Sequence, residues 1–372
     1  MESFLRASKA CLTTLNAYEK IIVVMGNPTC DLDSAVCALV HGFFVYTDRV
    51  QGQKNEKIAV IPIMNISKKE FRVKTEVVYY LGGHNLPLNL LTFRDEIDLR
   101  KLNAEGKLEL ILVDHHTLPK EDLSLADSVV EIIDHRPQDV TWSWSGRTIN
   151  LQTVGSCATL VAKNILEKRR MLLDSQVSNL LRGPILIDTC NFSKEADRAT
   201  PMDFDVIRQL EELNTLHPSR DQLYQDILNA KTDISQLTPD DLIIKDLKVV
   251  NGIPIVGLPI LVENFIKMDG AHEALDSFAM KENTPFAILI GLDLKNDVVT
   301  RDIAVFSLSS NELENKVIEA LMTSTNPKLE LTETHRFSKS GRTLIHYKQG
   351  NVKASRKQIL PIIQSVSRDC TC

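Results

Sequence analysis

Residues 23–36, VVMGNPTCDLDSAV, join an apolar run to an apolar helix-like segment through one short polar loop. The run IIVVMG at 21–26 has the length and composition of a buried strand, and residues 33–46 repeat apolar side chains at helical spacing. Asn27, Asp31 and Asp33 lie at the connection. A strand that leads directly into a helix is the repeating unit of α/β proteins, so this stretch predicts the fold class of the first half of the chain.

The same alternation continues beyond this stretch. Helix-like segments lie at 74–81 and 155–170, and the second begins at Ser156, a plausible cap. Strands that are apolar on both faces and alternate with helices indicate a mainly parallel sheet with crossover helices. We therefore expect a doubly wound α/β domain over residues 1–205 and a polar linker over 206–222. The further strand-like runs are 58–65, 108–114, 129–134 and 184–189.

The second half has a different pattern. A helical piece at 311–322 separates strand candidates, and the segment begins with a turn-rich stretch. This mixture predicts a smaller α+β domain over residues 223–372. The strand candidates are 249–261, 286–294, 303–309 and 343–350.

Composition narrows the classes of function. The chain of 372 residues carries a formal net charge of −6, which disfavours nonspecific binding to nucleic acid. No apolar run approaches the roughly 20 residues of a membrane span, and the N-terminus lacks the pattern of a signal peptide. Seven scattered cysteines, an odd number, favour reduced thiols. We expect a cytoplasmic protein without nucleic-acid or membrane partners.

Polar groups follow four of the strand-like runs in the first half. Carboxyl ends of parallel strands lie at one edge of a sheet, where α/β proteins bind ligands, so we expect these groups to gather there. A single Asp after a strand is commonly a cap or turn residue, and His135 could be a buried, hydrogen-bonded histidine. Recurrence at four strand ends favours a site. The groups are Asn27, Asp31 and Asp33; Asp114, His115 and His116; Asp134, His135 and Arg136; and Asp188.

Charge sharpens this expectation. Asp31, Asp33, Asp114 and Asp188 in one crevice would repel one another, and several would be driven to protonate. Two divalent cations would cancel the charge, and carboxylates with one or two imidazoles suit Mg²⁺ or Mn²⁺. Two-metal sites are typical of phosphoryl hydrolysis, in which a water between the metals becomes the nucleophile.

Six segments, taken in order, resemble the motifs of a known family. The sequence is similar to the DHH phosphoesterase superfamily, and within it to the branch of Prune-like exopolyphosphatases and family II inorganic pyrophosphatases. The resemblance spans nearly the whole chain. It implies a DHH domain followed by a DHHA2-type substrate-binding domain, with the active site in the cleft between them. The segments are GNPTCDLDSA (26–35), ILVDHHTLP (111–119), EIIDHRP (131–137), GSCATLVA (155–162), LIDTCNFS (186–193) and ASRKQILP (354–361).

The resemblance implies a metal-binding role for five matching residues. Asp31 would bind one metal and Asp33 the other, and Asp114 would bridge the two. His135 and Asp188 would complete the shell of the second metal. Asp134 is expected to orient these groups rather than to bind metal.

The resemblance also implies substrate-binding residues. Arg136 stands where a second His is usual, and its guanidinium should contact substrate phosphate. Arg356 and Lys357 should reach phosphate from the second domain, although an Arg-Lys pair taken alone is more typical of a solvated face. Lys231 is a weaker candidate. His115 and His116 follow Asp114, and one of them would donate a proton to the leaving oxygen; the alternative is a histidine that stabilises the turn.

Asn27 departs from the pyrophosphatase pattern, which has a metal-binding His at this place. An amide oxygen is a harder and weaker ligand than imidazole, which should shift preference from Mn²⁺ toward Mg²⁺. The amide NH₂ could instead point at substrate phosphate. Prune-like members share Asn here, so the departure favours them.

The function implied is metal-dependent hydrolysis of short-chain inorganic polyphosphate by a water that two metals activate. Pyrophosphate, or a cyclic nucleotide or other phosphodiester, is the alternative substrate. An alternative of another class is a protein-interaction scaffold of the Prune type, with protein partners.

Overall fold

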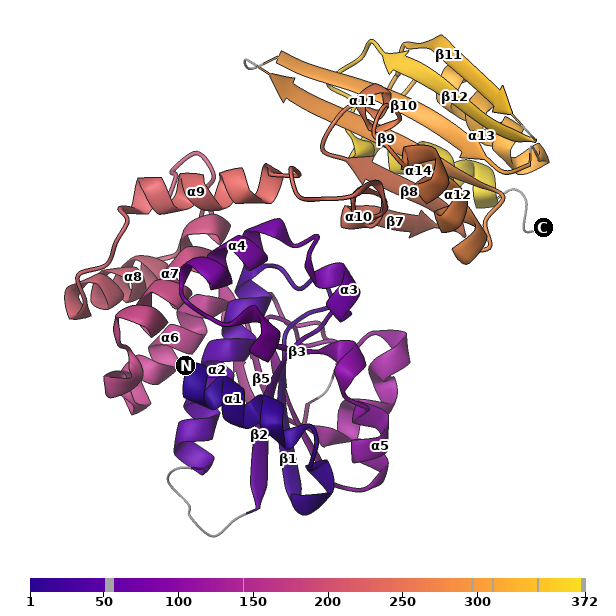
Figure 1. Cartoon of the computed structure of the whole chain (residues 1–372). Helices are drawn as coiled ribbons and strands as arrows, with labels where there is room; N and C mark the ends of the chain where they lie inside the picture. The colour runs from indigo at the N-terminus through magenta and orange to yellow at the C-terminus, as the bar shows by residue number, and fades with distance from the viewer. Residues whose placement is uncertain (51–56, 143, 296–297, 310, 340, 369–372) are drawn as a thin grey trace. The chain divides into compact units, whose positions relative to one another are not determined.

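The computed structural model describes residues 1–372 except 51–56, 143, 296–297, 310, 340 and 369–372. The chain divides into two compact units, which we call unit 1 (Met1–Asp233) and unit 2 (Ile234–Cys372). Each unit has its own six-stranded sheet (Figure 1).

The sheet of unit 1 is parallel throughout and confirms the predicted α/β class. Its strand order is β3-β2-β1-β4-β5-β6, so the direction of winding reverses between β1 and β4. Ligands bind at such a reversal, beyond the carboxyl ends of the strands. The strands are β1 (Lys20–Met25), β2 (Ile58–Met64), β3 (Thr92–Phe93), β4 (Leu108–Val113), β5 (Val129–Asp134) and β6 (Thr148–Leu151).

Helices cover both faces of this sheet. Alternate residues of β1 enter different cores: Ile22 and Val24 pack with the helices α2 and α6, whereas Ile21 and Val23 pack with α5. Burial on both faces explains why the strands are apolar throughout. The helices are α1 (Glu2–Cys11), α2 (Leu32–Arg49), α3 (Lys68–Phe71), α4 (Thr75–Gly83), α5 (Leu99–Ala104), α6 (Cys157–Lys168), α7 (Ser175–Asp188), α8 (Pro201–Leu213) and α9 (Arg220–Thr232).

The prediction of a strand at 184–189 is wrong. Residues up to Asp188 form the last turns of helix α7, with Pro184 inside the helix. A short apolar run fits a strand or a buried helix equally well, and here the preceding residues decide. Asp174 caps the helix by accepting from the Val177 amide at 2.8 Å, and apolar residues from Val177 onward recur at helical spacing. Asp188 therefore comes from a helix end.

The boundary between the units falls later than the predicted linker at 206–222. That stretch holds the end of α8 and the start of α9, and the division follows Asp233. Both helices bury apolar side chains in unit 1, including Ile207 from α8 and Ile227 from α9. Their polar faces make the sequence look like a linker, because polar residues dominate a helix that covers the outside of a domain.

Unit 2 is the smaller α+β domain that the sequence predicts. Its sheet has the order β11-β12-β10-β9-β8-β7 and is antiparallel except for the β8–β9 pair. Helices α10 to α12 pack on one face, and α13 and α14 pack on the other (Figure 1). The elements are α10 (Pro239–Lys245), β7 (Leu247–Val250), β8 (Ile253–Leu258), α11 (Val262–Phe265), α12 (Ala271–Lys281), β9 (Phe286–Lys295), β10 (Val298–Ser307), α13 (Glu312–Thr323), β11 (Leu331–Lys339), β12 (Arg342–Gln349) and α14 (Arg356–Arg368).

The edge strand β11 had no counterpart in the sequence prediction, because its sequence LTETHRFSK is largely polar and exposed. In the described part of the chain, no helix has both the length and the apolar character that crossing a membrane requires.

Candidate metal centre

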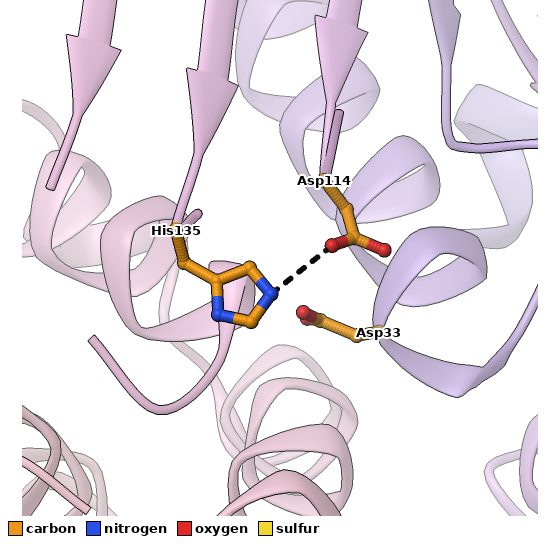
Figure 2. Close-up of side chains that lie close together, drawn as sticks. All are labelled: Asp33, Asp114 and His135. Atoms are coloured by element: carbon orange, nitrogen blue, oxygen red, sulfur yellow. Dashed lines mark ion pairs between the residues drawn. The ribbon is translucent and has the colours of Figure 1, made fainter. Parts of the chain in front are cut away.

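Three of the predicted ligands meet at the carboxyl edge of the parallel sheet (Figure 2). Asp114 directly follows β4, His135 directly follows β5, and Asp33 lies in the first turn of α2. One ligand atom of each lies within 4.8 Å of the others, and His135 Nε2 is 3.3 Å from Asp114 Oδ1. The residues come from three separate segments, which the winding of the sheet brings together.

Asp114 is fixed from several sides. Asp114 is 1% exposed, and its φ of 57° lies in the left-handed region, which a non-glycine residue adopts at a cost. Ser34 Oγ donates to Asp114 Oδ2 at 2.5 Å, and Asn27 Nδ2 donates to the same oxygen at 2.7 Å. These donors leave Oδ1 facing His135 and Arg136. Such strain is typical of positions that function requires.

Asp33 lies at the N-terminus of helix α6. The amides of Cys157 and Ala158 donate to its two carboxylate oxygens at 2.7 and 2.8 Å, and the Cys37 thiol donates at 3.3 Å. These donors and the helix dipole favour a negative charge. Burial, followed by the charge of Asp114, nevertheless raises the pKa of Asp33 to about 7.

Asp31 and Asp188 feel the same accumulation of charge. Asp31 caps α2 by accepting from the Ser34 amide at 3.1 Å, and burial and the charge of Asp114 raise its pKa. Burial, and then the charges of Asp33 and Asp31, raise the pKa of Asp188 well above its usual value. The structure thus brings Asp31, Asp33, Asp114 and Asp188 into one electrostatic environment. With His135, they are called the carboxylate site below.

His135 is held in the tautomer that leaves Nε2 toward the carboxylates. Its Nδ1 is 3.0 Å from the carbonyl oxygen of Val154, which can only accept, so Nδ1 carries a proton. Burial acts to lower the pKa of His135, but the hydrogen bond to Asp114 and the charge of Asp33 outweigh it and raise the pKa to about 10. A proton on Nε2 therefore offsets part of the negative charge.

The carboxylate site fits divalent cations. Asp188 Oδ2 is buried, and no hydrogen-bond partner for it occurs among the described residues. Burial and like charge drive these carboxylates toward protonation, and His135 carries a proton beside them. A doubly charged cation would take the place of these protons. Oxygen ligands with one imidazole suit Mg²⁺ or Mn²⁺.

Arg136 lies at the rim of the carboxylate site. Its side chain is 49% exposed, and Nη2 is 3.3 Å from Asp114 Oδ1. Asp134, which is fully buried, accepts from the amides of His135 at 2.8 Å and of Arg136 at 3.3 Å. Asp134 therefore holds the main chain of the loop that carries both residues, and its role as an orienting group for the ligands stays a prediction.

The structure does not leave His116 free to donate a proton. Asp139 donates its amide to His116 Nε2 at 2.8 Å, so the ring proton is on Nδ1, which lies 2.5 Å from Asp134 Oδ2. Both ring nitrogens are engaged, which favours the turn-stabilising alternative. His115 Nδ1 is 2.9 Å from the carbonyl oxygen of Val113, and burial lowers the pKa of His115, so this imidazole stays neutral.

Asn27 belongs to the site as a donor. Its Nδ2 donates to Asp114, and its Oδ1 accepts from the Thr29 amide at 2.8 Å. The amide oxygen is thus turned away from Asp114. Ser34, Cys37 and the α6 amides are supporting groups that the sequence did not single out; Ser34 and the α6 N-terminus do lie inside the quoted segments GNPTCDLDSA and GSCATLVA.

The predicted basic residues outside the carboxylate site have other surroundings. Arg356, at the start of α14, donates to the Asp246 carbonyl at 2.7 Å and lies 2.6 Å from its carboxylate. Its guanidinium passes so close to Gly257 that a Cβ there would be 2.4 Å from Nη1. Lys357 and Lys231 are exposed. A role for these three in substrate binding stays a prediction.

Known proteins resemble the chain in sequence and in fold. Residues 225–366 match the DHHA2 domain family. Exopolyphosphatase PRUNE1 of Bos taurus is 35% identical over 370 residues, and that of Homo sapiens is 34% identical; each alignment covers 98% of this chain and 79% of the relative. The crystal structure of a Methanococcus jannaschii putative family II inorganic pyrophosphatase matches with a TM-score of 0.50 at 20% identity, covering 93% of this chain and 99% of the other. At that identity the structural likeness bears on the fold alone.

Proposed function

The chain belongs to the Prune family of DHH phosphoesterases, and from this premise we propose that it hydrolyses phosphoanhydride bonds of short-chain inorganic polyphosphate with bound divalent cations. The observation that carries the proposal is the convergence of Asp33, Asp114 and His135 at the reversal of the parallel sheet. The relatives are named as exopolyphosphatases, which points to the same substrate class.

Five residues would hold the cations. The raised pKa values of Asp31, Asp33 and Asp188 indicate a charge that a divalent cation would stabilise. When bound, two such cations supply Lewis-acid charge that activates water at neutral pH and offsets the charge of phosphate oxygens. The residues are Asp31, Asp33, Asp114, His135 and Asp188.

The remaining groups position these ligands and the substrate. Ser34 and Asn27 hold one oxygen of Asp114 and so fix the direction of the other. The Val154 carbonyl fixes the ring of His135. Arg136, exposed at the rim, would move from Asp114 to a phosphate oxygen, where its planar fork can bind two oxygens at once.

Phosphate release from defined substrates tests the proposal. The substrates are tripolyphosphate, tetrapolyphosphate and pyrophosphate, followed by phosphate release, and cyclic AMP, followed by formation of AMP, each with Mg²⁺, with Mn²⁺ and with EDTA. We expect release from the polyphosphates with metal and none with EDTA. Asp114→Ala should lose the activity, whereas the control Asp205→Asn should keep it, because Asp205 is an exposed partner of Arg208 on α8.

Each outcome bears on a separate part of the proposal. If the wild type leaves all three phosphoanhydrides intact, the hydrolase function is refuted. Faster release from pyrophosphate than from tripolyphosphate would assign the site to pyrophosphatase chemistry, and cleavage of cyclic AMP alone would assign it to phosphodiesters. The prediction of protein partners is independent of these measurements and stays a prediction.

A further inference from the structure

Unit 2 holds a chain of hydrogen bonds that has no part in the proposed phosphate chemistry. Thr334 Oγ1 lies 2.6 Å from His346 Nδ1, and His346 Nε2 lies 2.8 Å from Asp302 Oδ2. The three residues, called the relay below, come from the neighbouring strands β11, β12 and β10. A hydroxyl, an imidazole and a carboxylate linked in this order have the arrangement of a nucleophile, its base and the group that orients the base.

Asp302 is a buried carboxylate held by donors. It is 3% exposed, and its oxygens accept from the amides of Val262 at 2.8 Å and Glu263 at 3.0 Å. Opposite it on β9 stands Gly291, where a Cβ would lie 2.1 Å from Asp302 Oδ1. The missing side chain at Gly291 provides the space in which Asp302 sits.

These contacts determine the tautomer of His346. His346 is 5% exposed, and its imidazole lies between Asp302 and Thr334. Because the Asp302 carboxylate acts as acceptor, His346 Nε2 carries the proton and Nδ1 is left with its lone pair. That lone pair accepts the hydroxyl proton of Thr334, which is the geometry a general base requires.

Thr334 is placed by an irregularity of the edge strand. The register of β11 against β12 shifts between Glu333 and His335, so Thr334 is the extra residue of a bulge. Bulges redirect a side chain and occur often beside active sites. Thr334 is exposed, whereas His346 and Asp302 behind it are buried. Thr334 also lines a cavity, so a ligand there can approach its side chain, while the base behind it is buried.

The relay opens into a cavity of about 600 Å³ between α11, the start of α12 and the strands β10 to β12. This volume suits a small ligand. Lys348 also lines the cavity and lies directly opposite Asp302 in the β10–β12 register, so both point to one face of the sheet. A cation on this face would favour a negative charge that develops in the cavity. The second lysine of the lining, Lys267, is paired with Glu263 at 2.7 Å. The apolar lining residues are Leu261, Ile266, Phe337 and Leu344.

We propose that the relay is a second active site, in which Thr334 accepts the acyl group of a small apolar carboxylic ester. Thr334 Oγ1 bonds to the ester carbonyl carbon while His346 Nδ1 takes the hydroxyl proton. The bond to the leaving alkoxide then breaks, and the alkoxide takes that proton from His346. Water reverses the same steps to release the carboxylic acid and restore Thr334, so ester and water are the only reactants.

Hydrolysis of p-nitrophenyl butyrate by the full chain tests this proposal. The assay uses Asp114→Ala as the parent, because that protein lacks the proposed phosphate chemistry, and EDTA is present throughout. We expect turnover by the parent and a loss of about 100-fold or more on Thr334→Val, the range for removing a general-base or nucleophile pair. Thr334→Ser should restore turnover. Thr332→Val is the matched control, because Thr332 is an exposed threonine of the same strand.

Mass spectrometry identifies the residue that carries the acyl group. After a rapid acid quench, we expect one butyryl group on the peptide that contains Thr334, and none on that peptide in Thr334→Val. His346→Gln should lower the rate of acylation about 100-fold. Equal rates for Thr334→Val and the parent, an acyl group on a lysine instead, or no turnover by the parent would each overturn the proposal. Phosphate release by Thr334→Val in the otherwise wild-type chain should match the wild type.

Discussion

Asp33 in unit 1 and Asp302 in unit 2 are held almost identically and have opposite surroundings. Each is less than 5% exposed, and each accepts from two consecutive main-chain amides at the start of a helix, α6 or α11. Burial and the charges of the Asp114 and Asp31 carboxylates raise the pKa of Asp33 to about 7, against the opposing charge of His135. Around Asp302 the neighbours are His346 and, across the strand pair, Lys348.

The comparison separates two causes that often occur together. Donors at a helix start fix a buried carboxylate in place, but they are common to both residues and so do not make a metal centre. What distinguishes unit 1 is the accumulation of like charge without enough internal cations, which a divalent ion can relieve. A single carboxylate whose oxygens both accept hydrogen bonds, such as Asp302, can instead orient a histidine.

Asp33→Asn and Asp302→Asn should have the most different effects on phosphate release. We expect Asp33→Asn to lower metal-dependent phosphate release about a thousandfold, equivalent to ~4 kcal/mol, because a charged ligand is lost. Asp302→Asn should leave the rate of phosphate release per folded molecule within about twofold, since Asp302 is not among the proposed metal ligands or substrate-binding residues. Steady-state phosphate release, scaled by the folded fraction, measures both. A small effect of Asp33→Asn would remove Asp33 from the proposed ligands.

The pH dependence of stability gives the second test, in EDTA. Asp33 has its pKa raised from 3.8 to about 7, so between these values the folded chain binds more protons than the unfolded chain. Stability must therefore fall as pH rises through this window. His135, with its pKa raised from 6.5 to about 10, stabilises the fold below pH 6.5, and this contribution is lost as pH rises to 10. Both shifts act in one direction.

Thermal unfolding of the metal-free chain between pH 4 and 9 measures this effect. We expect the Tm to fall across the range, by about 2–4 °C for each kcal/mol of stability lost in a domain of this size. Asp33→Asn should flatten the slope between pH 4 and 7, and saturating Mg²⁺ or Mn²⁺ should raise the Tm more at pH 8 than at pH 5. An equal slope in wild type and Asp33→Asn would contradict the assignment of the effect to this carboxyl.

Loss of the buried carboxylate of unit 2 should lower the stability of that unit at neutral pH. Asp302→Asn leaves the amides of Val262 and Glu263 with a weaker acceptor and should destabilise unit 2 by about 2–3 kcal/mol at neutral pH. Gly291→Ala should produce a similar loss, because its Cβ would displace Asp302. Native-state hydrogen exchange of β9 and β10 amides reports both. Unchanged protection in both variants would show that the contacts of Asp302 contribute little.

Much of unit 1 could be predicted from sequence, because its signals are local. Most strands of the parallel sheet are continuous apolar runs. Asp114 and His135 each follow such a run directly, and Asp33 begins the helix that follows another run. The sequence identifies Asp188 but predicts it at a strand end, since PILI alone does not distinguish a strand from the end of a buried helix. The engagement of His116 by Asp139 was not predictable, because it depends on the path of a loop.

The relay of unit 2 has no comparable signal. Thr334, His346 and Asp302 are separated along the chain, and nothing in LTETHRFSK marks Thr334 as a bulge. Gly291 lies within a predicted strand. A glycine is needed there because the Asp302 carboxylate lies across the strand pair, and only the pairing of β9 with β10 shows this. A site formed by residues paired across antiparallel strands is thus harder to predict from sequence than a site formed at the carboxyl ends of parallel strands.

Arg136→Lys should produce a smaller change at the rim of the carboxylate site. Arg136 pairs with Asp114 from an exposed position, and we propose that its fork binds substrate phosphate. Lysine keeps the charge but loses the second hydrogen bond, so we expect KM for tripolyphosphate to rise about tenfold with kcat changed less. Arg147→Lys, on the loop that precedes β6, is the control and should change neither constant. An unchanged KM for Arg136→Lys would exclude a bidentate contact.

Asn27→His should have the smallest effect, because it changes the choice of metal more than the rate. Asn27 now donates to Asp114 and turns its oxygen to Thr29, so its present role is to orient a neighbour. Imidazole is a softer ligand, and we expect it to raise the ratio of Mn²⁺-supported to Mg²⁺-supported phosphate release severalfold. Asn27→Ala is the matched control: it removes the donor without adding a ligand, and should lower both rates while keeping their ratio. Equal changes of the ratio in both variants would show that residue 27 affects metal choice only through Asp114. The comparison with the histidine of pyrophosphatases would then not apply.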